Sequence, residues 1–230
     1  MTDILQQQIA YYRARAGEYD EWFYRIGRYD RGAEWNARWF AEVETLMREV
    51  AAIGRVGHTL ELAAGTGNFT RELAKISQQV TALDASAEVL AINRDKVNVN
   101  HIAYQQADLF NWQPEAEYNL VFMAFWMSHV PPEKLDDFLA TVRKATKAGG
   151  RVFMIDSMPD ETRTSSAVNH DPYQADSIYH TRKLNDGQEF TIIKVFYEPE
   201  ALTAKLAEHG FTAQVQTTGH YFWWANGVKR

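Results

Sequence analysis

The chain has no cysteine among its 230 residues, so disulfide bonds and thiolate chemistry are both excluded. It has no apolar run long enough to cross a membrane, and its opening residues MTDILQQQIAYYRAR lack the apolar core of a signal peptide. Positive charge is also scarce, because 24 Lys and Arg residues against 30 Asp and Glu residues leave a formal charge of −6. This balance argues against nucleic acid or an anionic membrane as the main partner, and we expect a cytoplasmic protein.

Hydrophobic residues make up 46% of the chain and charged residues 23%, which is typical of a globular protein with a real core. From residue 56 onward, short apolar runs alternate with helical stretches. Strands are expected at 58–64, 79–84, 101–108, 118–125 and 150–157, with helices at 68–76, 87–97 and 131–146. This alternation predicts a parallel sheet covered by helices on both faces, which is an α/β fold.

The two ends of the chain follow other patterns. Two aromatic-rich helices are expected at 4–24 and 33–53, and residues 158–177 are polar without periodicity. The runs 178–184 and 189–197 flank Asn185-Asp186-Gly187-Gln188, which predicts a β-hairpin. A helix at 198–209 and strands at 211–217 and 220–226 are expected to finish the chain. We therefore expect one domain over 1–230, made of a helical lid (1–55), a core (56–157), an insertion (158–197) and a C-terminal part (198–230).

The sharpest local signal is Glu61-Leu-Ala-Ala-Gly65-Thr-Gly67-Asn, which lies where the first expected strand ends and a helix begins. Glycines there let the backbone turn tightly and approach a ligand where a β-carbon would collide. The helix that follows offers unpaired N–H groups to a carboxylate or phosphate. Taken alone, Gly65 and Gly67 could also form a purely structural turn.

Two further acids end the next expected strands. Asp84 could accept hydrogen bonds from ribose hydroxyls, or it could only cap the helix that starts at Ser86. Asp108 could accept from an exocyclic adenine amine, with the N–H of Leu109 beside it, or it could be a surface acid. Because the carboxyl ends of neighbouring parallel strands meet at one edge of the sheet, these acids and the glycine turn together predict a nucleoside-type ligand.

A dinucleotide is the competing ligand, and two residues weigh against it. The dinucleotide fingerprint has a third Gly or Ala at the position where this chain has Thr70. Glu61 would repel a pyrophosphate, whereas beside an ammonium and a sulfonium it is favourable. The charge pattern therefore favours S-adenosylmethionine (SAM).

In order and spacing, these residues resemble the class I SAM-dependent methyltransferases that act on small molecules. The motifs are Glu61-x-x-x-Gly65-x-Gly67, Asp84, Ala107-Asp108-Leu109, Tyr118-Asn-Leu-Val-Phe and Gly149-Gly150-Arg-Val, which cover residues 56–157. The opening Tyr11-Tyr12-Arg-x-Arg-Ala-x-Glu-Tyr19-Asp is similar to the lid helix of many members. Asn119 departs from the pattern, because Asp is usual there. The resemblance implies a Rossmann-like, doubly wound sheet of seven strands, mostly parallel with an antiparallel last strand, together with an N-terminal lid and a β-hairpin insertion.

The resemblance also implies roles for single residues. Glu61, Ala63, Gly65 and Gly67 would hold the methionine part of SAM. Asp84 would hold the ribose with Ala85 beside the adenine, and Asp108 with Leu109 would hold the adenine edge. Tyr11 and Tyr19 would line the donor side. After transfer the cofactor would leave as S-adenosylhomocysteine (SAH).

His129 is the candidate catalytic residue, because it follows the fourth expected strand, where the acceptor is expected to sit. An unperturbed histidine has a pKa of about 6.5, so it could take a proton near neutrality, or it could only orient the acceptor. Among the other histidines, His170 and His180 could touch substrate, whereas the patterns make His58, His101 and His209 structural. No histidines and acids have metal-ligand spacing.

The acceptor is expected to be a small, aromatic or heteroaromatic molecule, because the lid and the Phe125–Trp126 segment are rich in aromatic residues. Trp22, Trp126 and Trp223 could form walls of an aromatic pocket. The acceptor itself, the accepting atom and the oligomeric state stay open.

Two other functions stay open. Tyr179-x-x-x-Lys183, with Ser166 upstream, imitates the catalytic set of NAD(P)-dependent short-chain oxidoreductases. That set needs a helix, whereas the pattern here predicts a strand, and the glycine turn follows a long leader. The second rival is a SAM-binding or protein-interaction module that kept the fold and lost catalysis.

Overall fold

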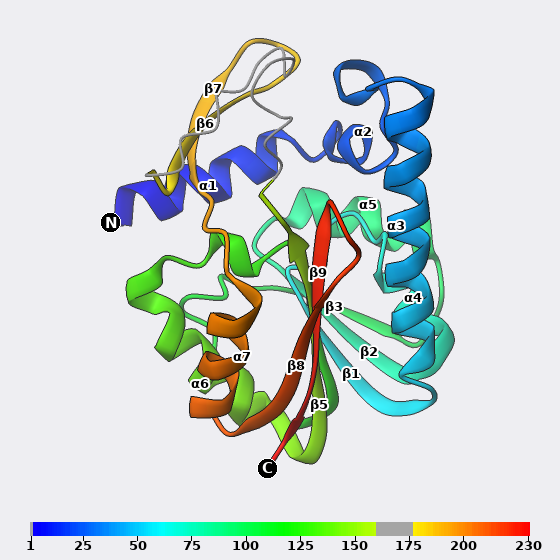
Figure 1. The fold of residues 1–230 in the computed structure, drawn as a ribbon, viewed down its shortest axis with the longest axis vertical. Helices are drawn as coiled ribbons and strands as arrows, with labels where there is room; N and C mark the ends of the chain where they lie inside the picture. Colours follow the sequence, from blue (N-terminus) through cyan, green and yellow to red (C-terminus); the bar gives the residue numbers. More distant parts are fainter. Residues whose placement is uncertain (1, 160–176) are drawn as a thin grey trace.

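A seven-stranded sheet forms the centre of the computed structural model, which describes residues 2–159 and 177–230 (Figure 1). The strands are β1 (Val56–Leu62), β2 (Ser77–Asp84), β3 (Ile102–Gln106), β4 (Tyr118–Ala124), β5 (Thr146–Ser157), β8 (Phe211–Thr217) and β9 (Phe222–Lys229). Their order is β3-β2-β1-β4-β5-β9-β8, and β9 runs antiparallel to both of its neighbours. The pairs β1–β2, β1–β4, β2–β3 and β4–β5 are parallel. The predicted Rossmann-like fold with an antiparallel last strand is therefore confirmed.

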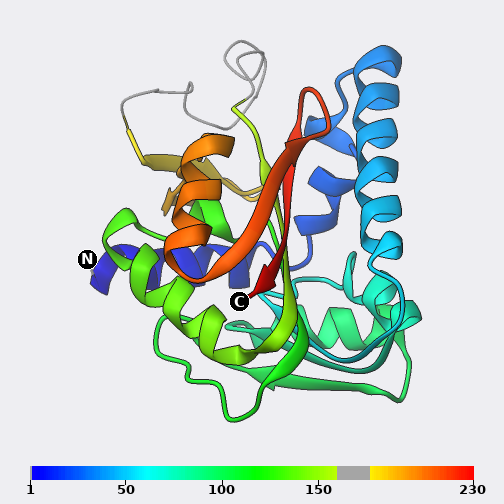
Figure 2. The same ribbon diagram turned by 60° about the horizontal axis from the view of Figure 1, so that its bottom comes forward.

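Helices cover both faces of the sheet (Figures 1 and 2). One face carries α3 (Ala33–Ala52), α4 (Thr70–Ile76) and α5 (Ala87–Val97), and the other carries α6 (Leu135–Ala145) and α7 (Pro199–Glu208). Leu120 and Phe122 of β4 pack in the cluster on the α3 side, while Val121 and Met123 pack in the cluster on the α6 side. Because β4 is buried on both faces, its sequence is a continuous apolar run and does not alternate.

The N-terminal region differs from the two helices expected there. The first expected helix divides into α1 (Thr2–Ala14) and α2 (Tyr19–Phe23), and the break contains Gly17, a weak helix former. A short 3-10 helix, η1 (Gly27–Tyr29), precedes α3. Trp39 and Leu46 of α3 are fully buried against the sheet, so this part of the expected lid belongs to the core.

The insertion contains the predicted hairpin, made of β6 (Tyr179–Lys183) and β7 (Glu189–Ile193). Gly187 has a φ of 92° at the turn, where the N–H of Leu184 donates to the carbonyl of Gln188. The hairpin lies on α1, apart from the central sheet (Figure 1). Two 3-10 helices, η2 (Met127–His129) and η3 (Pro132–Lys134), connect β4 to α6. No helix among the described residues is long and apolar enough to cross a membrane.

Candidate functional site

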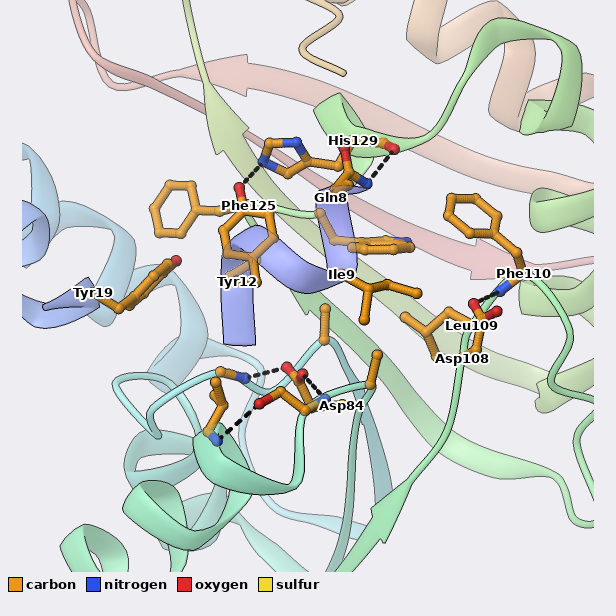
Figure 3. Close-up of a pocket in the computed structure, with 17 residues that line it drawn as sticks. Gln8, Ile9, Tyr12, Tyr19, Asp84, Asp108, Leu109, Phe110, Phe125 and His129 are labelled. Carbon is orange, nitrogen blue, oxygen red and sulfur yellow. Dashed lines mark hydrogen bonds between the residues drawn. The ribbon is translucent and has the colours of Figure 1, made fainter. Parts of the chain in front are cut away.

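A pocket opens at the carboxyl ends of β1, β2 and β4 and is closed on one side by α1 and α2 (Figure 3). It is lined by Gln8, Ile9, Tyr12, Tyr19, Ala63, Gly65, Asp84, Ala85, Ser86, Val89, Asp108, Leu109, Phe110, Ala124, Phe125, Trp126 and His129. A second pocket shares Tyr19, Ala63, Gly65 and Phe125 and extends to Glu61, Thr66 and Asn68. The sequence-predicted strand-end residues thus meet at one place.

Glu61 is the last residue but one of β1 and is buried, at 2% exposure. Burial raises the pKa of Glu61 to about 8, although a hydrogen bond from Thr70 opposes this shift. Its Oε2 atom has no hydrogen-bond partner. A buried carboxyl oxygen without a partner is unfavourable, and a cation in the adjoining pocket would satisfy it. The ammonium of SAM fits this position by charge.

The glycine turn uses its two glycines in different ways. Gly65 lines the pocket with a φ of 56°, and its N–H donates to Asp84 Oδ2 over 3.0 Å. Gly67, at a φ of 92°, packs against α5, where a β-carbon would come within 2.8 Å of Asn93 Oδ1. Gly67 therefore permits close packing, whereas Gly65 faces the pocket.

Asn93 of α5 is a site residue that the sequence analysis missed. Its Nδ2 donates to the Gly65 carbonyl at 3.0 Å and to Thr70 Oγ1 at 2.8 Å, and its side chain is fully buried. Asn93 therefore connects α5 to the glycine turn and to the start of α4. A polar residue on the inner face of the expected helix is a signal of a buried hydrogen bond. The sequence could not identify its partners, because Gly65 and Thr70 are more than 20 residues away.

The two strand-end acids both reach the pocket. Asp84 accepts from the N–H of Gly65 with one oxygen and from the N–H of Ser86 with the other, each at 3.0 Å. Burial raises the pKa of Asp84, and these backbone hydrogen bonds oppose the shift. Asp108 accepts from the N–H of Phe110 at 3.0 Å. Ser86 itself caps α5 by accepting from Val89, so Asp84 is placed to do more than cap the helix.

Two non-glycine residues at the site have left-handed backbones. Ala63 follows β1 with a φ of 53°, and Phe125 follows β4 with a φ of 58°. Both residues line both pockets. L-residues rarely adopt this conformation, and such strain concentrates where a ligand site determines the backbone. Ala63 and Phe125 thus mark the two strand ends between which a ligand would lie.

The aromatic residues of the lid occupy different positions from those expected. Tyr19 lines the pocket as expected, but Tyr11 does not. Tyr11 is fully buried against Leu184 and Ile192 of the hairpin, and Tyr12 lines the pocket in its place. Consecutive residues of a helix point about 100° apart, so a shift of one position moves a side chain to another face. Tyr12 shares the pocket-facing side of α1 with Gln8, four residues earlier (Figure 3).

His129 lies at the pocket with its ring held at both nitrogens. Nδ1 lies 2.6 Å from the carbonyl oxygen of Ile193, so Nδ1 carries the proton and donates. Nε2 then accepts from the hydroxyl of Tyr12, also at 2.6 Å. Burial, with a smaller contribution from the charge of Lys194, lowers the pKa of His129 to about 3. The imidazole is therefore uncharged at neutral pH. The lone pair on Nε2 already accepts a hydrogen bond from Tyr12.

The other candidate residues occupy varied positions. Three histidines pack against protein atoms as expected: His58 with Thr81 at 2.9 Å, His101 with the Ala74 carbonyl at 3.0 Å and His209 with Asp136 at 2.7 Å. His180 is buried in β6 at 4% exposure, and His170 lies outside the described residues.

The three candidate tryptophans also lie at different places, and not all of them line a pocket. Trp126 lines the pocket beside Phe110, with ring centroids 5.3 Å apart. Trp22 packs on Phe125 from behind, with centroids 4.9 Å apart, and Trp223 belongs to the α6-side core. Only Trp126 of the three candidates therefore lines a pocket described here.

The dehydrogenase-like set does not assemble. Tyr179 and Lys183 lie in strand β6, so the helix that this chemistry needs is absent at that position. Tyr179 is 52% exposed and lines neither pocket. Ser166 lies outside the described residues.

Comparison with known proteins gives matches along the core of the chain. A family model described as a methyltransferase domain matches residues 59–150. An uncharacterized methyltransferase of Staphylococcus carnosus is 27% identical over 119 residues, which are 52% of this chain and 56% of that protein. Phosphoethanolamine N-methyltransferase 1 of Zea mays is 27% identical over 135 residues, 57% of this chain and 27% of that protein. The match thus spans about half of the first relative and about a quarter of the second.

Solved structures match over the full chain. The complex of DhpI with SAH is 32% identical with a TM-score of 0.78, over 99% of this chain and 97% of that chain. The complex of DhpI with SAM and HEP is 33% identical with a TM-score of 0.77, over 97% of both chains. With this identity over nearly the whole length, and with the glycine turn and strand-end acids gathered in one pocket, the chain belongs to the class I SAM-dependent methyltransferases and takes SAM as its cofactor.

Proposed function

We propose that the chain transfers a methyl group from SAM to a small acceptor that carries an anionic group. SAM supplies a methyl group on a sulfonium, which is already a good leaving group. The protein must therefore hold the acceptor in line with the S–CH₃ bond and exclude water. The arrangement of charged groups around the pocket supports the anionic acceptor.

The cofactor contacts are proposed from the geometry of the pocket. Glu61 and the turn at Gly65 would hold the methionine part, because Glu61 lines the second pocket and one of its oxygens has no hydrogen-bond partner. Asp84 is placed for the ribose, and Asp108 with Leu109 for the adenine edge, because all three line the adjoining pocket. Ala63 and Ala85 line the same pocket between these acids.

The observation that carries the anionic acceptor is a cluster of guanidinium groups formed by Arg15, which is buried, and by Arg28 and Arg182, which are partly buried. The Arg15 guanidinium donates to the Tyr29 hydroxyl at 3.2 Å, but its Nε atom has no partner. Arg28 pairs with Glu18 through one nitrogen at 2.8 Å, and its Nε and Nη1 atoms have no partner. Burial lowers the pKa of Arg182, which means that its charge is poorly solvated.

A buried charge costs several kcal/mol unless it is paired. No acid among the residues that the structure describes pairs with Arg15 or Arg182. An anionic group placed between them would pair with both charges and use the free N–H groups, as Arg does with phosphate or carboxylate.

The cluster lies next to the proposed donor side of the pocket. The guanidinium of Arg15 is 5.1 Å from the ring centroid of Tyr19, which lines the pocket. Arg15 and Arg182 both act electrostatically on Tyr12, another pocket residue. The relative from Zea mays is named for a phosphorylated small amine, which supports an acceptor of this chemistry.

We further propose that His129 orients Tyr12 and does not remove a proton from the acceptor. Transfer of a proton to a buried imidazole with a pKa of about 3 is unfavourable at neutral pH. The Nε2 atom that would take the proton already accepts from Tyr12. His129 is then a positioning residue, and Tyr12 is the group that meets the acceptor.

A neutral aromatic or heteroaromatic acceptor is the second candidate. Phe110, Phe125 and Trp126 line the pocket and could stack on a planar ring. This candidate leaves the guanidinium cluster unexplained, so the anionic acceptor is preferred.

The test is transfer of labelled methyl from SAM to two panels of small molecules, phosphorylated amines or alcohols and neutral heteroaromatic compounds. We expect transfer to members of the anionic panel and weak transfer to their dephosphorylated forms. Arg182→Met should raise the KM for the anionic acceptor by roughly 10- to 100-fold and leave SAH affinity unchanged. Equal transfer to neutral heteroaromatic compounds, unaffected by this substitution, would favour the second candidate. No transfer to any metabolite would favour a non-catalytic SAM-binding module.

A further inference from the structure

The short helix α2 contacts the glycine turn through one carboxylate, that of Asp20. Its Oδ1 atom accepts from Thr66 Oγ1 at 2.6 Å and from Asn68 Nδ2 at 3.1 Å. Its Oδ2 atom pairs with Lys96 Nζ at 2.7 Å. Thr66 and Asn68 lie on either side of Gly67 in sequence, so Asp20 connects α2 to the turn itself.

The partners of Asp20 are also bonded to one another. Lys96 Nζ, at the end of α5, donates to Asn68 Oδ1 at 2.6 Å, and the Tyr24 hydroxyl donates to the same oxygen at 3.1 Å. Thr66 and Asn68 are buried at 1% and 7% exposure. Asp20 supplies the one negative charge of this network, and hydrogen bonds to a charged group are stronger than neutral ones.

Asp20 lines neither pocket, whereas its neighbour Tyr19 lines both of them. Thr66 and Asn68 line the pocket that contains Glu61. Asp20 therefore acts on the cofactor side only through the residues that it holds. Movement of α2 away from the turn would break the contacts to Thr66, Asn68 and Lys96 and would carry Tyr19 away from the pocket.

We propose that Asp20 is a positioning residue that latches α2 onto the glycine turn and thereby slows dissociation of the cofactor. This inference rests on the proposed placement of SAM and SAH beside Glu61 and Gly65. Asp20 then helps to retain the cofactor without touching it. Lid closure over a bound ligand commonly sets the rate at which the ligand leaves.

The same helix supplies a matched control. Glu21 lies one residue after Asp20 and accepts from Asn185 Nδ2 at the hairpin tip with both oxygens, at 3.1 Å. Among the described residues, no hydrogen bond or ion pair joins Glu21 to the glycine turn. Glu21→Gln therefore removes one charge from α2, as Asp20→Asn does, but leaves the latch intact.

The experiment measures the dissociation rate of labelled SAH during a chase with unlabelled SAH. We expect Asp20→Asn to raise this rate on the order of tenfold to a hundredfold, the equivalent of losing one charge-assisted hydrogen bond, with little change in the association rate. Glu21→Gln should dissociate like the wild type. Lys96→Met should also raise the rate, and the double variant should add little to the larger single effect because both changes open one network.

Two results would overturn the proposal, namely a wild-type dissociation rate in Asp20→Asn or an equal increase in Glu21→Gln. Circular dichroism checks that each variant is folded. If Asp20→Asn does not fold, Thr66→Val removes one contact of the latch and should raise the rate by a smaller factor, and an unchanged rate there would also refute the latch. Failure of the wild type to bind SAH would refute the cofactor placement instead, so the two failures are distinguishable.

Discussion

Glu61 is buried and Asp84 is partly buried, and the pKa values of both are raised because water is excluded from their carboxyl groups. The pKa of Glu61, at about 8, means that this group is mostly protonated in the free chain at neutral pH. A cationic ligand beside it favours the charged form and lowers that pKa again. If the ammonium of the cofactor lies beside Glu61 as proposed, cofactor binding is coupled to the release of a proton.

We predict that SAH binding at pH 7 releases up to one proton, as measured by calorimetry in buffers of different ionisation enthalpy. A proton is released and not taken up, because the raised pKa keeps the free carboxyl group protonated up to about pH 8, whereas the carboxyl group beside the bound cation is ionised. SAH affinity should therefore rise with pH, by at most about tenfold per unit, and level off above pH 8. Glu61→Gln, which cannot ionise, should bind more weakly and lose most of the proton release. Proton release that is unchanged in this variant would assign it to another group.

His129 permits a second prediction at this scale. Because burial lowers its pKa to about 3, wild-type kcat/KM should show no inflection near pH 6.5 that depends on this residue. His129→Asn should mainly raise the KM of the acceptor, with a smaller change in kcat and no change in SAH affinity. A proton-removing histidine would instead show an inflection, and its loss would lower the rate by roughly 10²- to 10⁴-fold. Wild-type kinetics in His129→Asn would exclude both roles.

At the scale of elements, α1, α2 and the β6–β7 hairpin form one cap over the pocket. The side chain of Gln8 connects α1 to the carbonyl of His129 and to the N–H of Ile193 in β7. Asn185 at the hairpin tip donates from its backbone N–H to Glu18 beside α2. The contacts to Ile193 and Asn185 join residues more than 160 positions apart in sequence, and the contact to His129 joins residues 121 positions apart. The cap therefore joins α1, α2 and the hairpin to one another and to the His129 segment that lines the pocket.

We predict that SAH slows amide hydrogen exchange in α1 and α2, over residues 4–30, because the cap closes on the bound ligand. The change should extend to β7 through Gln8. Helices α6 and α7 cover the sheet away from the cap and provide the internal control (Figure 1). The measurement is exchange mass spectrometry with and without SAH. Equal exchange of residues 4–30 in both states would show that these helices are a static wall.

At the scale of the whole molecule, a ligand that binds only the folded chain raises its unfolding temperature. We predict that SAH at 100 times its Kd adds about 2.7 kcal/mol to the free energy of unfolding, and that NADPH adds nothing measurable. The reason is that a pyrophosphate beside Glu61 would leave this buried carboxyl group without a cation to pair with, and that Thr70 occupies the third fingerprint position. Thermal unfolding followed by circular dichroism checks both ligands. Comparable stabilisation by NADPH would contradict the placement of Glu61 beside a cation.

Much of this architecture could be predicted from local pattern. The strands, the glycine turn and the acids at 84 and 108 are local features, because alternation of apolar runs and the ends of parallel strands depend on neighbours in sequence. The hairpin turn at Asn185–Gly187 is local for the same reason. The prediction of one continuous helix over 4–24 was wrong. The chain breaks between α1 and α2 in a segment that contains Gly17, because α1 packs on the hairpin whereas α2 contacts the glycine turn.

The sequence by itself determined the fold class, the cofactor and the strand-end residues that gather at the pocket. Only the tertiary structure decided that Tyr12 and not Tyr11 lines the pocket, that Gly67 serves packing against Asn93, and that His129 is a neutral acceptor for Tyr12. The physical reason is common to these cases. Which face a side chain presents, and how much water reaches it, depends on segments that are distant in sequence and become neighbours only when the chain packs.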